Sequence, residues 1–387
     1  VEDFIQRITR AKYDIDGLLL NEESQGLGFS NLIYLHMRLE EFYKSIDRNK
    51  VNVFFIEEPE SHMHPQMQNV FIRFLKKYYI DKKIQGLITT HSNEIARMVG
   101  LDSLRVMRET EKSKSELFNL NKFRNSIKNI KVESIDNESK FLLENFFDWF
   151  FEIGYSELIF ADKVVLYEGD SERLYIRKLL GLSELSSLYD SYIAFIQVGG
   201  AYAHNYIPIL TMLKIKTLII TDLDYNKAAI TLEDARNSTS TNSTINHCYR
   251  LACPEKGKKY FPTIEELYDF QKKHKVILYN SLVYLAFQDE NSTARTLEEA
   301  MLNKLLGSDV FKKIKRSTWK EIRADNKLFF TIPNNKKNEE DSEYSIRNIV
   351  EATSDNKTDF MYSVILSGNE EKMLPDYIKE GLLWLAK

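Results

Sequence analysis

Two short acidic motifs, each directly after a run of apolar, β-forming residues, restrict the fold of this chain more than any other feature. The motif EGDSE occupies residues 168–172 after the run 163–167, and the motif DLD occupies residues 222–224 after the run 216–221. Short runs that are apolar at nearly every position are typical of strands buried on both faces of a parallel sheet. The sequence therefore predicts an α/β fold.

The two motifs together predict a site for divalent metal ions. The carboxyl ends of parallel strands meet at one edge of a sheet, which brings Glu168 close to Asp222 and Asp224. If the second motif stays extended, its two aspartates point the same way, because strand side chains alternate. Clustered carboxylates repel one another unless a cation lies between them, and their oxygens suit Mg²⁺ or Mn²⁺. A D-x-D motif alone is more often an ordinary acidic turn after a strand.

A second pair of strand ends, near the start of the chain, suggests a nucleotide site. Glu57 and Glu58 follow the apolar run 51–56, and His91 follows the run 86–90. A carboxylate in this place can hold Mg²⁺ through water, and the next can polarise an attacking water molecule. A histidine one strand over can reach a γ-phosphate. The alternative explanation is a strand that ends in a solvated acidic turn.

A polar loop that contains Ser24 and Gly26 precedes a helix expected at 31–46, so its backbone N–H groups can face a phosphate. The sequence has no G-x-x-x-x-G-K-[ST] loop, which supplies the backbone cradle and the lysine for the β- and γ-phosphates. Because the first residue is Val1 rather than methionine, we expect that an N-terminal half with this loop is missing.

The remaining pattern predicts alternating helices and strands. Further helices are expected at 1–12, 66–79, 171–180 and 204–213, and further strands at 103–107 and 192–198. The polar stretch 108–140 predicts a linker with some helix, and the aromatic stretch 141–160 predicts a core helix or a hinge. The low-complexity stretch 236–246 predicts a mobile loop, and 334–344 predicts a second polar loop.

Charge and composition narrow the possible functions. A net charge of -4 excludes a polybasic protein that coats nucleic acid through bulk charge. One local basic run, which includes Trp319, comprises Lys312, Lys313, Lys315 and Arg316. This run can grip a phosphate backbone, although a solvated helix face explains it at least as well. No apolar run approaches the ~18 residues of a membrane span and no signal peptide is visible, so we expect a cytoplasmic protein without membrane contact and with reduced cysteines.

The motifs resemble those of OLD-family ATP-dependent endonucleases, which carry a TOPRIM domain. IEEPESHMHPQ looks like the Walker B motif and D-loop of an ABC-type ATPase, ITTHS like its switch-histidine loop, and SQGLG like a degenerate signature motif. EGDSE with DLD is similar to the TOPRIM signature, and further likenesses to the OLD family are VGGAYAHNY, RTLEEAML, NKTDFMYSVI and LPDYIKEGLLWL.

The resemblance implies an α/β fold in three parts. Residues 1–110 would be the C-terminal part of an ABC-type ATPase domain, without its Walker A half. Residues 111–160 would be a linker or helical hinge. Residues 161–387 would be a Rossmann-like TOPRIM nuclease domain with a parallel sheet and C-terminal helices.

The resemblance also implies residue roles in the ATPase segment. Glu57 would bind Mg²⁺, Glu58 would act on the catalytic water, and His91 would contact the γ-phosphate. Ser24 and Gly26 would belong to the signature loop that binds ATP.

In the TOPRIM domain, the resemblance implies two metal ions. The three strand-end carboxylates would bind the catalytic metal, and Glu172 and Glu298 would complete a second position. Glu299 is the alternative to Glu298, because the two glutamates are adjacent in RTLEEAML. Lys357 would stabilise charge on the phosphate, although a solvated surface lysine is an equal alternative.

The implied activity is metal-dependent DNA cleavage, as a nick or a double-strand cut, with Mg²⁺ or Mn²⁺ and under regulation by ATP with Mg²⁺. The implied partners are DNA and further copies of the chain, as a dimer or tetramer. A role in antiphage defence, as in Gabija-type or retron-linked systems, would add a helicase-like protein or a retron reverse transcriptase with its DNA. The alternatives are a TOPRIM topoisomerase or primase, and a non-catalytic DNA-binding scaffold.

Overall fold

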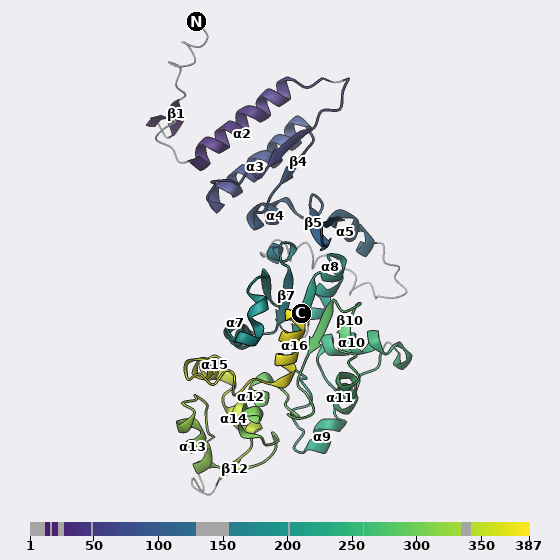
Figure 1. Ribbon diagram of the computed structural model, residues 1–387, viewed down its shortest axis with the longest axis vertical. Coiled ribbons are helices and arrows are strands. Elements are labelled where there is room, and N and C mark those ends of the chain that lie inside the picture. Colours follow the sequence, from purple (N-terminus) through teal and green to yellow (C-terminus); the bar gives the residue numbers. More distant parts are fainter. Residues whose placement is uncertain are drawn as a thin grey trace. The chain divides into compact units, whose positions relative to one another are not determined.

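The computed structural model describes residues 12–15, 18–21, 27–47, 49–128, 155–199, 202–257, 259–333 and 342–387 (Figure 1). The chain divides into two compact units, Val1–Phe160 and Ala161–Lys387. The helix expected at 1–12, most of the stretch 129–160 and most of the loop 334–344 lie outside the described residues. In the described part of the chain, no helix is long and apolar enough to cross a membrane.

The first unit contains a parallel pair of strands with helices packed on one face. Strands β3 (Phe54–Glu57) and β4 (Gly86–Thr89) pair in parallel, with Glu57 opposite Thr89. Helices α2 (Leu27–Lys44), α3 (Pro65–Lys82) and α4 (Asn93–Val99) supply the core, and β1 (Lys12–Ile15) pairs with β2 (Leu18–Asn21) in a separate hairpin. The strands and helices expected between residues 31 and 90 are therefore confirmed, with bounds shifted by a few residues.

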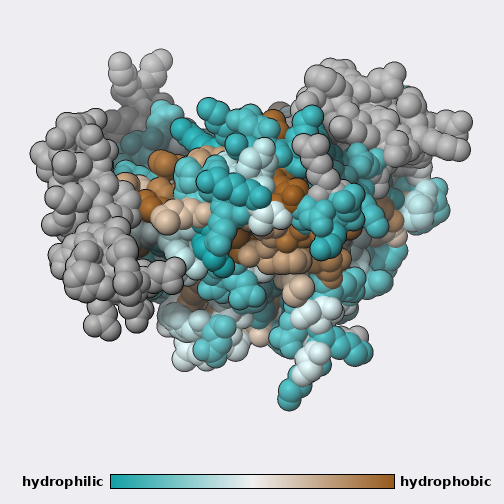
Figure 2. Space-filling model, turned by 90° about the horizontal axis from the view of Figure 1, so that it is seen from above, coloured by the Kyte–Doolittle hydropathy of each residue, from teal (hydrophilic) through white to brown (hydrophobic). Residues whose placement is uncertain are grey.

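The other face of this strand pair is apolar and exposed. Phe55 and Leu87 are register partners, and their exposed fractions are 72% and 57%. Apolar surface is also visible among hydrophilic residues in Figure 2. Parallel sheets are usually covered on both faces, so half of this pair's apolar surface has no cover among the described residues.

The strand expected at 103–107 is confirmed with shifted bounds, but the linker expected from residue 108 is wrong for residues 108–119, which belong to a hairpin. Strand β5 (Arg105–Glu111) does not join β3 and β4 but forms an antiparallel hairpin with β6 (Lys114–Asn119), before α5 (Leu120–Lys128). Val106 and Phe118 are buried register partners, whereas Arg108 lies opposite Glu116. A hairpin with one buried face and cross-strand charge pairs has a polar composition, and this is why 108–119 resembled a linker.

The second unit contains the predicted parallel sheet. Its strand order is β10 (Ile277–Leu278), β11 (Val283–Ala286), β9 (Lys216–Ile220), β7 (Lys163–Tyr167) and β8 (Ile193–Gln197). All neighbours pair in parallel except β10 with β11. The central strands β7 and β9 are buried on both faces after their first residue, as their unbroken apolar runs require.

Helices surround this sheet (Figure 1). They are α7 (Asp170–Leu179), α8 (Ile207–Met212), α9 (Leu232–Asn237), α10 (Ser243–Ala252), α11 (Ile264–Lys272), α12 (Leu297–Leu306), α13 (Arg316–Asp325), α14 (Ile346–Ala352), α15 (Lys357–Leu366) and α16 (Asp376–Ala386). Helix α16 packs closely on the sheet, because a Cβ atom on Gly381 would lie 2.7 Å from Leu218 of β9. Helices α12 to α15, with the short strands β12 (Ile314–Lys315) and β13 (Glu343–Tyr344), lie together at one end of the unit.

The stretch 236–246 is not the mobile loop expected from its composition. Residue Ser240 bridges to Tyr225, and Asn242 is only 1% exposed. The Asn242 side chain accepts hydrogen bonds from the backbone N–H groups of Thr244 and Ile245, and so caps α10. Ser240, Asn242 and Asn246 are buried here, and their side chains bond to backbone groups instead of contacting water, a role that composition does not reveal.

Trp319 belongs to the core rather than to a surface that contacts DNA. It is fully buried, its Nε1 donates to the backbone oxygen of Tyr344 at 2.9 Å, and its ring meets that of Phe330 edge-on. We therefore expect Trp319→Phe to lower the free energy of unfolding by about 1–3 kcal/mol, because the buried Tyr344 oxygen loses its donor. Urea unfolding measures this change. The neighbouring exposed variant Lys320→Ala should stay within about 0.5 kcal/mol of wild type, and equal effects of the two would contradict the assignment.

Candidate functional site

Three adjacent strands of the second unit place polar side chains at one edge of the sheet. Glu168 directly follows the last residue of β7. Asp222 follows β9, and Gln288 follows β11, each after one further residue. Glu168 Oε1 accepts a hydrogen bond from the backbone nitrogen of Asp222 at 3.2 Å. The two strand-end motifs therefore meet, as the parallel arrangement predicts.

Neutral side chains fix the orientation of these two carboxylates. Glu168 Oε1 accepts hydrogen bonds from the Thr221 hydroxyl and, at 3.1 Å, from Asn242 Nδ2. Asp222 Oδ1 accepts from Gln288 Nε2, while Gln288 Oε1 accepts from the Leu223 backbone at 2.7 Å. Neutral donors orient a carboxylate without cancelling its negative charge.

Two further carboxylates reach the same group from the first turns of helices. Glu172 in α7 is 9% exposed, and Glu298 in α12 is 4% exposed. Glu172 Oε2 accepts a hydrogen bond from the Gly169 backbone at 3.0 Å. Lys357, the first residue of α15, places its Nζ 3.1 Å from Glu298 Oε2.

The acidic side chains raise one another's pKa values. Burial, and then the charges of Glu298 and Glu168, raise the pKa of Glu172 to about 7. Burial raises the pKa of Asp222 well above its usual range, with further contributions from Glu172 and Glu168. Burial lowers the pKa of Lys357, but the charges of Glu298 and Asp222 outweigh this and raise it overall. The group has an excess of negative charge that a divalent cation would offset, and its oxygen donors fit Mg²⁺ or Mn²⁺.

Asp224 does not have the extended conformation on which the sequence argument depended. Strand β9 ends at Ile220, and Asp224 has a φ of +47°. Its Oδ1 lies 3.0 Å from an Arg295 nitrogen, yet its charge still raises the pKa values of Glu168 and Asp222. Asp224 therefore reaches the group through a turn and not through strand alternation.

The carboxylates are near one another but are held by protein partners. Across the described ranges, no three histidine, cysteine or acidic side chains are arranged to hold a metal ion as they stand. Glu299, the alternative to Glu298, is fully engaged with Arg347 at 3.0 Å, so Glu298 is the member of this pair that faces the carboxylate group.

In the first unit, the predicted nucleotide residues come together at the ends of β3 and β4. His91 Nε2 lies 3.3 Å from Glu58 Oε1, and both side chains are exposed. Glu60, which the sequence did not single out, accepts hydrogen bonds from the His91 backbone and the Thr90 hydroxyl, both at 2.7 Å. Glu57 is register partner to Thr89 on the neighbouring strand.

The start of α2 contacts the same turn. Asn31 Nδ2 donates to the backbone oxygens of Pro59 and Ser61 at 3.2 Å. A Cβ atom on Gly28 would lie 2.6 Å from the backbone oxygen of His62, so only glycine fits there. Ser24 and Gly26 lie outside the described residues.

The basic run has a mixed placement. Lys312, Lys313 and Lys315 are exposed, whereas Arg316 is half-buried and donates to the Pro333 oxygen at 3.1 Å. Three exposed lysines remain available to a phosphate backbone.

Several residues at the site escaped the sequence analysis. They are Thr221, Asn242, Gln288, Arg295 and Tyr377, whose hydroxyl lies 3.3 Å from Gln288 Nε2. The apolar run 283–287 before Gln288 is a strand pattern like the others and was the available signal. Thr221 directly precedes the DLD motif, Arg295 begins RTLEEAML and Tyr377 lies in LPDYIKEGLLWL, but nothing in these patterns gives the three residues a role. Asn242 occurs in no recognisable motif.

Comparisons with known proteins place two families along the chain. The AAA ATPase domain family matches residues 2–96, and the TOPRIM domain of overcoming lysogenization defect (OLD) protein-like proteins matches residues 159–224. A solved structure of the C-terminal region of the Burkholderia pseudomallei OLD protein aligns with a TM-score of 0.33 at 18% identity, covering 59% of this chain and 98% of that one.

The curated relatives that the chain resembles are named as nucleases. Endonuclease GajA from Bacillus cereus (strain HuB5-5) is 27% identical, over 100% of this chain and 56% of that protein. The OLD nuclease of Thermus scotoductus (strain ATCC 700910 / SA-01) is 26% identical, over 49% of this chain and 34% of that protein. The chain thus spans little more than half the length of the first relative and a third of the second. The order of the two family matches and the similarity to both relatives show that the chain joins an AAA-type ATPase segment to an OLD-like TOPRIM domain.

Proposed function

We propose that this protein is a metal-dependent DNA endonuclease. The observation that carries the proposal is the group formed by the buried Glu172 and Glu298 with the half-buried Glu168 and Asp222, and with Lys357 beside it. Holding divalent cations is a common role of clustered carboxylates that repel one another in proteins. The relatives named as nucleases support the choice of DNA as the substrate.

Each residue of the group has a proposed role. Glu168, Asp222 and Asp224 would bind the catalytic Mg²⁺ or Mn²⁺, and Glu172 and Glu298 would bind a second ion. Paired metal ions of this kind activate water and stabilise the leaving oxygen of a phosphodiester.

The protein's own side chains complete the chemistry. Thr221 and Asn242 would hold Glu168 in orientation, and Gln288 would do the same for Asp222. Lys357 would turn from Glu298 to stabilise negative charge on the phosphate. The exposed Lys312, Lys313 and Lys315, with Arg316, would contact the DNA backbone.

For the first unit we propose binding of ATP with Mg²⁺ that regulates cleavage. Glu57 would hold Mg²⁺, Glu58 would act on the catalytic water, and His91 would contact the γ-phosphate, with Ser24 and Gly26 also binding ATP. The close approach of His91 and Glu58 supports this assignment. We assign residues 1–110 to the ATPase part, 111–160 to a linker and 161–387 to the nuclease domain.

The biological context is also a proposal. We propose a role in antiphage defence, in which a helicase-like protein or a retron reverse transcriptase with its DNA would be the partner. We propose assembly into a dimer or tetramer, with action in the cytoplasm.

Plasmid cleavage tests the nuclease directly. We expect supercoiled plasmid to be nicked or cut with Mg²⁺ or Mn²⁺ but not with EDTA, and ATP to change the rate. Glu168→Gln should reduce the cleavage rate by more than about 100-fold. Mutation of a residue that only orients a metal ligand typically lowers activity about 10- to 100-fold, and loss of a ligand itself should lower it further. The exposed carboxylate variant Glu184→Gln should cleave as wild type does. Relaxation of plasmid without free ends would instead indicate a topoisomerase.

Removal of one repelling carboxylate should stabilise the metal-free protein. The pKa of Glu172 rises from 4.5 to about 7 on folding. Between these pH values the folded state holds a proton that the unfolded state has lost, so stability falls as pH rises. At pH 8 in EDTA we expect Glu172→Gln to raise the free energy of unfolding by up to about 3 kcal/mol, and at pH 4.5 to change it little.

Urea unfolding at both pH values measures this difference, with Glu184→Gln as the exposed control. The glutamine oxygen can still accept the Gly169 hydrogen bond, so the helix cap is retained. A variant that is no more stable than wild type at pH 8 would show that the carboxylates do not repel one another strongly.

A further inference from the structure

A buried ion pair joins two helices behind the carboxylate group. Arg347 of α14 and Glu299 of α12 are 5% and 2% exposed. Arg347 Nε lies 3.0 Å from Glu299 Oε1, and Nη2 lies 3.1 Å from Oε2, which makes a two-point contact. Buried ion pairs contribute little net stability, because the loss of hydration offsets their attraction. The pair therefore calls for an explanation other than stability.

The other contacts of Arg347 reach the segment directly after the DLD motif. Its Nη1 donates to the Ala229 backbone oxygen at 3.1 Å, and its Nη2 donates to the Tyr225 hydroxyl. The guanidinium carbon lies 5.0 Å from the centre of the Tyr225 ring and 4.5 Å from that of Phe311. Arg347 thus fixes α12 and the segment after Asp224 with one planar group.

Glu299 extends these contacts back to Asp224. Its Oε2 also accepts a hydrogen bond from the Arg295 backbone nitrogen at 2.7 Å. The Arg295 side chain donates from Nε to the Tyr225 backbone oxygen at 2.7 Å and from Nη2 to Asp224 Oδ1 at 3.0 Å. An unbroken series of polar contacts therefore runs from Arg347 through Glu299 and Arg295 to Asp224.

We infer that Arg347 and Glu299 are positioning residues for the metal site, an inference that rests on the proposed function. Neither is placed to touch a metal ion. Glu299 is adjacent to Glu298 on α12, so the ion pair sets the rotation of the helix that presents Glu298. Through Arg295 the same pair holds the turn that presents Asp224, whose φ of +47° needs outside support. Residues that orient metal ligands in this way typically contribute about 10- to 100-fold to metal affinity.

The variant that tests this inference must remove the contacts without leaving a buried charge. Arg347→Met alone would leave the Glu299 carboxylate buried without a partner, which by itself destabilises a fold strongly. The double variant Arg347→Met with Glu299→Leu removes both charges and fills a similar volume, which folded proteins commonly tolerate. It eliminates the polar contacts to Arg295 and Tyr225 while keeping an apolar contact between α12 and α14.

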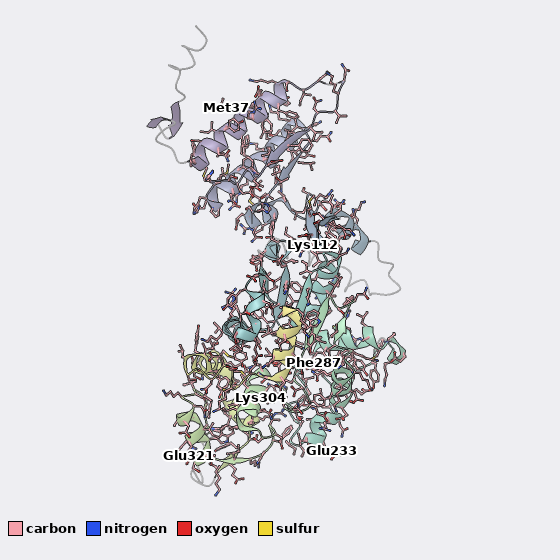
Figure 3. The ribbon with its side chains drawn as sticks, in the orientation of Figure 1. Met37, Lys112, Glu233, Phe287, Lys304 and Glu321 are labelled. Carbon is pink, nitrogen blue, oxygen red and sulfur yellow. The ribbon has the colours of Figure 1, made fainter. Side chains whose placement is uncertain are left out.

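A matched control removes a different ion pair from the same helix. Lys304, labelled in Figure 3, lies near the end of α12, and its Nζ is 2.7 Å from Asp376 Oδ1 of α16. The variant Lys304→Met with Asp376→Asn likewise removes an ion pair between α12 and a neighbouring helix. It leaves the contacts of Glu298 and Asp224 intact.

Mn²⁺ affinity, measured by calorimetry, and thermal unfolding in EDTA are the two readouts. We expect the Arg347→Met, Glu299→Leu variant to unfold near the wild-type temperature in EDTA but to bind Mn²⁺ about 10- to 100-fold more weakly, and the control to bind as wild type does. Unchanged Mn²⁺ affinity in the double variant would overturn the inference alone. A double variant that is unfolded in EDTA would also overturn it, because the pair would then serve the fold itself. Wild-type protein that binds no Mn²⁺ would overturn the proposed function.

Discussion

The fold of the second unit must hold together a group of carboxylates that repel one another. The group comprises Glu168, Glu172, Asp222 and Glu298, which come from two strand ends and two helix starts. Burial and nearby negative charges raise the pKa values of Glu168, Glu172 and Asp222. No local contact draws these groups together. The parallel sheet, with β7 beside β9, and the packing of α7 and α12 hold them against their own electrostatic preference.

The surrounding residues fall into two kinds. Thr221, Asn242 and Gln288 are neutral and orient individual carboxylates, so the negative charge of the group remains. Arg347 and Arg295 are cationic but engage Glu299 and Asp224 at the margin of the group. Lys357 alone, among the described cationic side chains, makes an ion pair with a carboxylate inside it. Positive charge is therefore kept mostly at the edge, which leaves the centre of the group negatively charged.

The sequence predicted the features that follow from local pattern. Glu168 and Asp222 were predicted to meet because unbroken apolar runs identify buried parallel strands, and the chain direction places both residues at one sheet edge. The Asp224 turn could not be predicted, because its conformation depends on Arg295, a residue far along the chain. The β5–β6 hairpin and the ordered stretch around Asn242 were missed for a related reason. The polar side chains of the hairpin pair with the neighbouring strand, and Asn242 bonds to a distant segment. Composition alone does not distinguish such residues from solvated ones.

Lys357 is also the first residue of α15, and this position has a consequence for the helix itself. The first turn of a helix carries partial positive charge from its free N–H groups, so an ammonium group there is unfavourable by about 0.3–1 kcal/mol. An uncharged residue at this position would suit the helix dipole better. The Glu298 carboxylate, whose Oε2 lies 3.1 Å from Lys357 Nζ, compensates for the unfavourable interaction with the helix dipole. The lysine at this position therefore serves the acidic group and not its own helix.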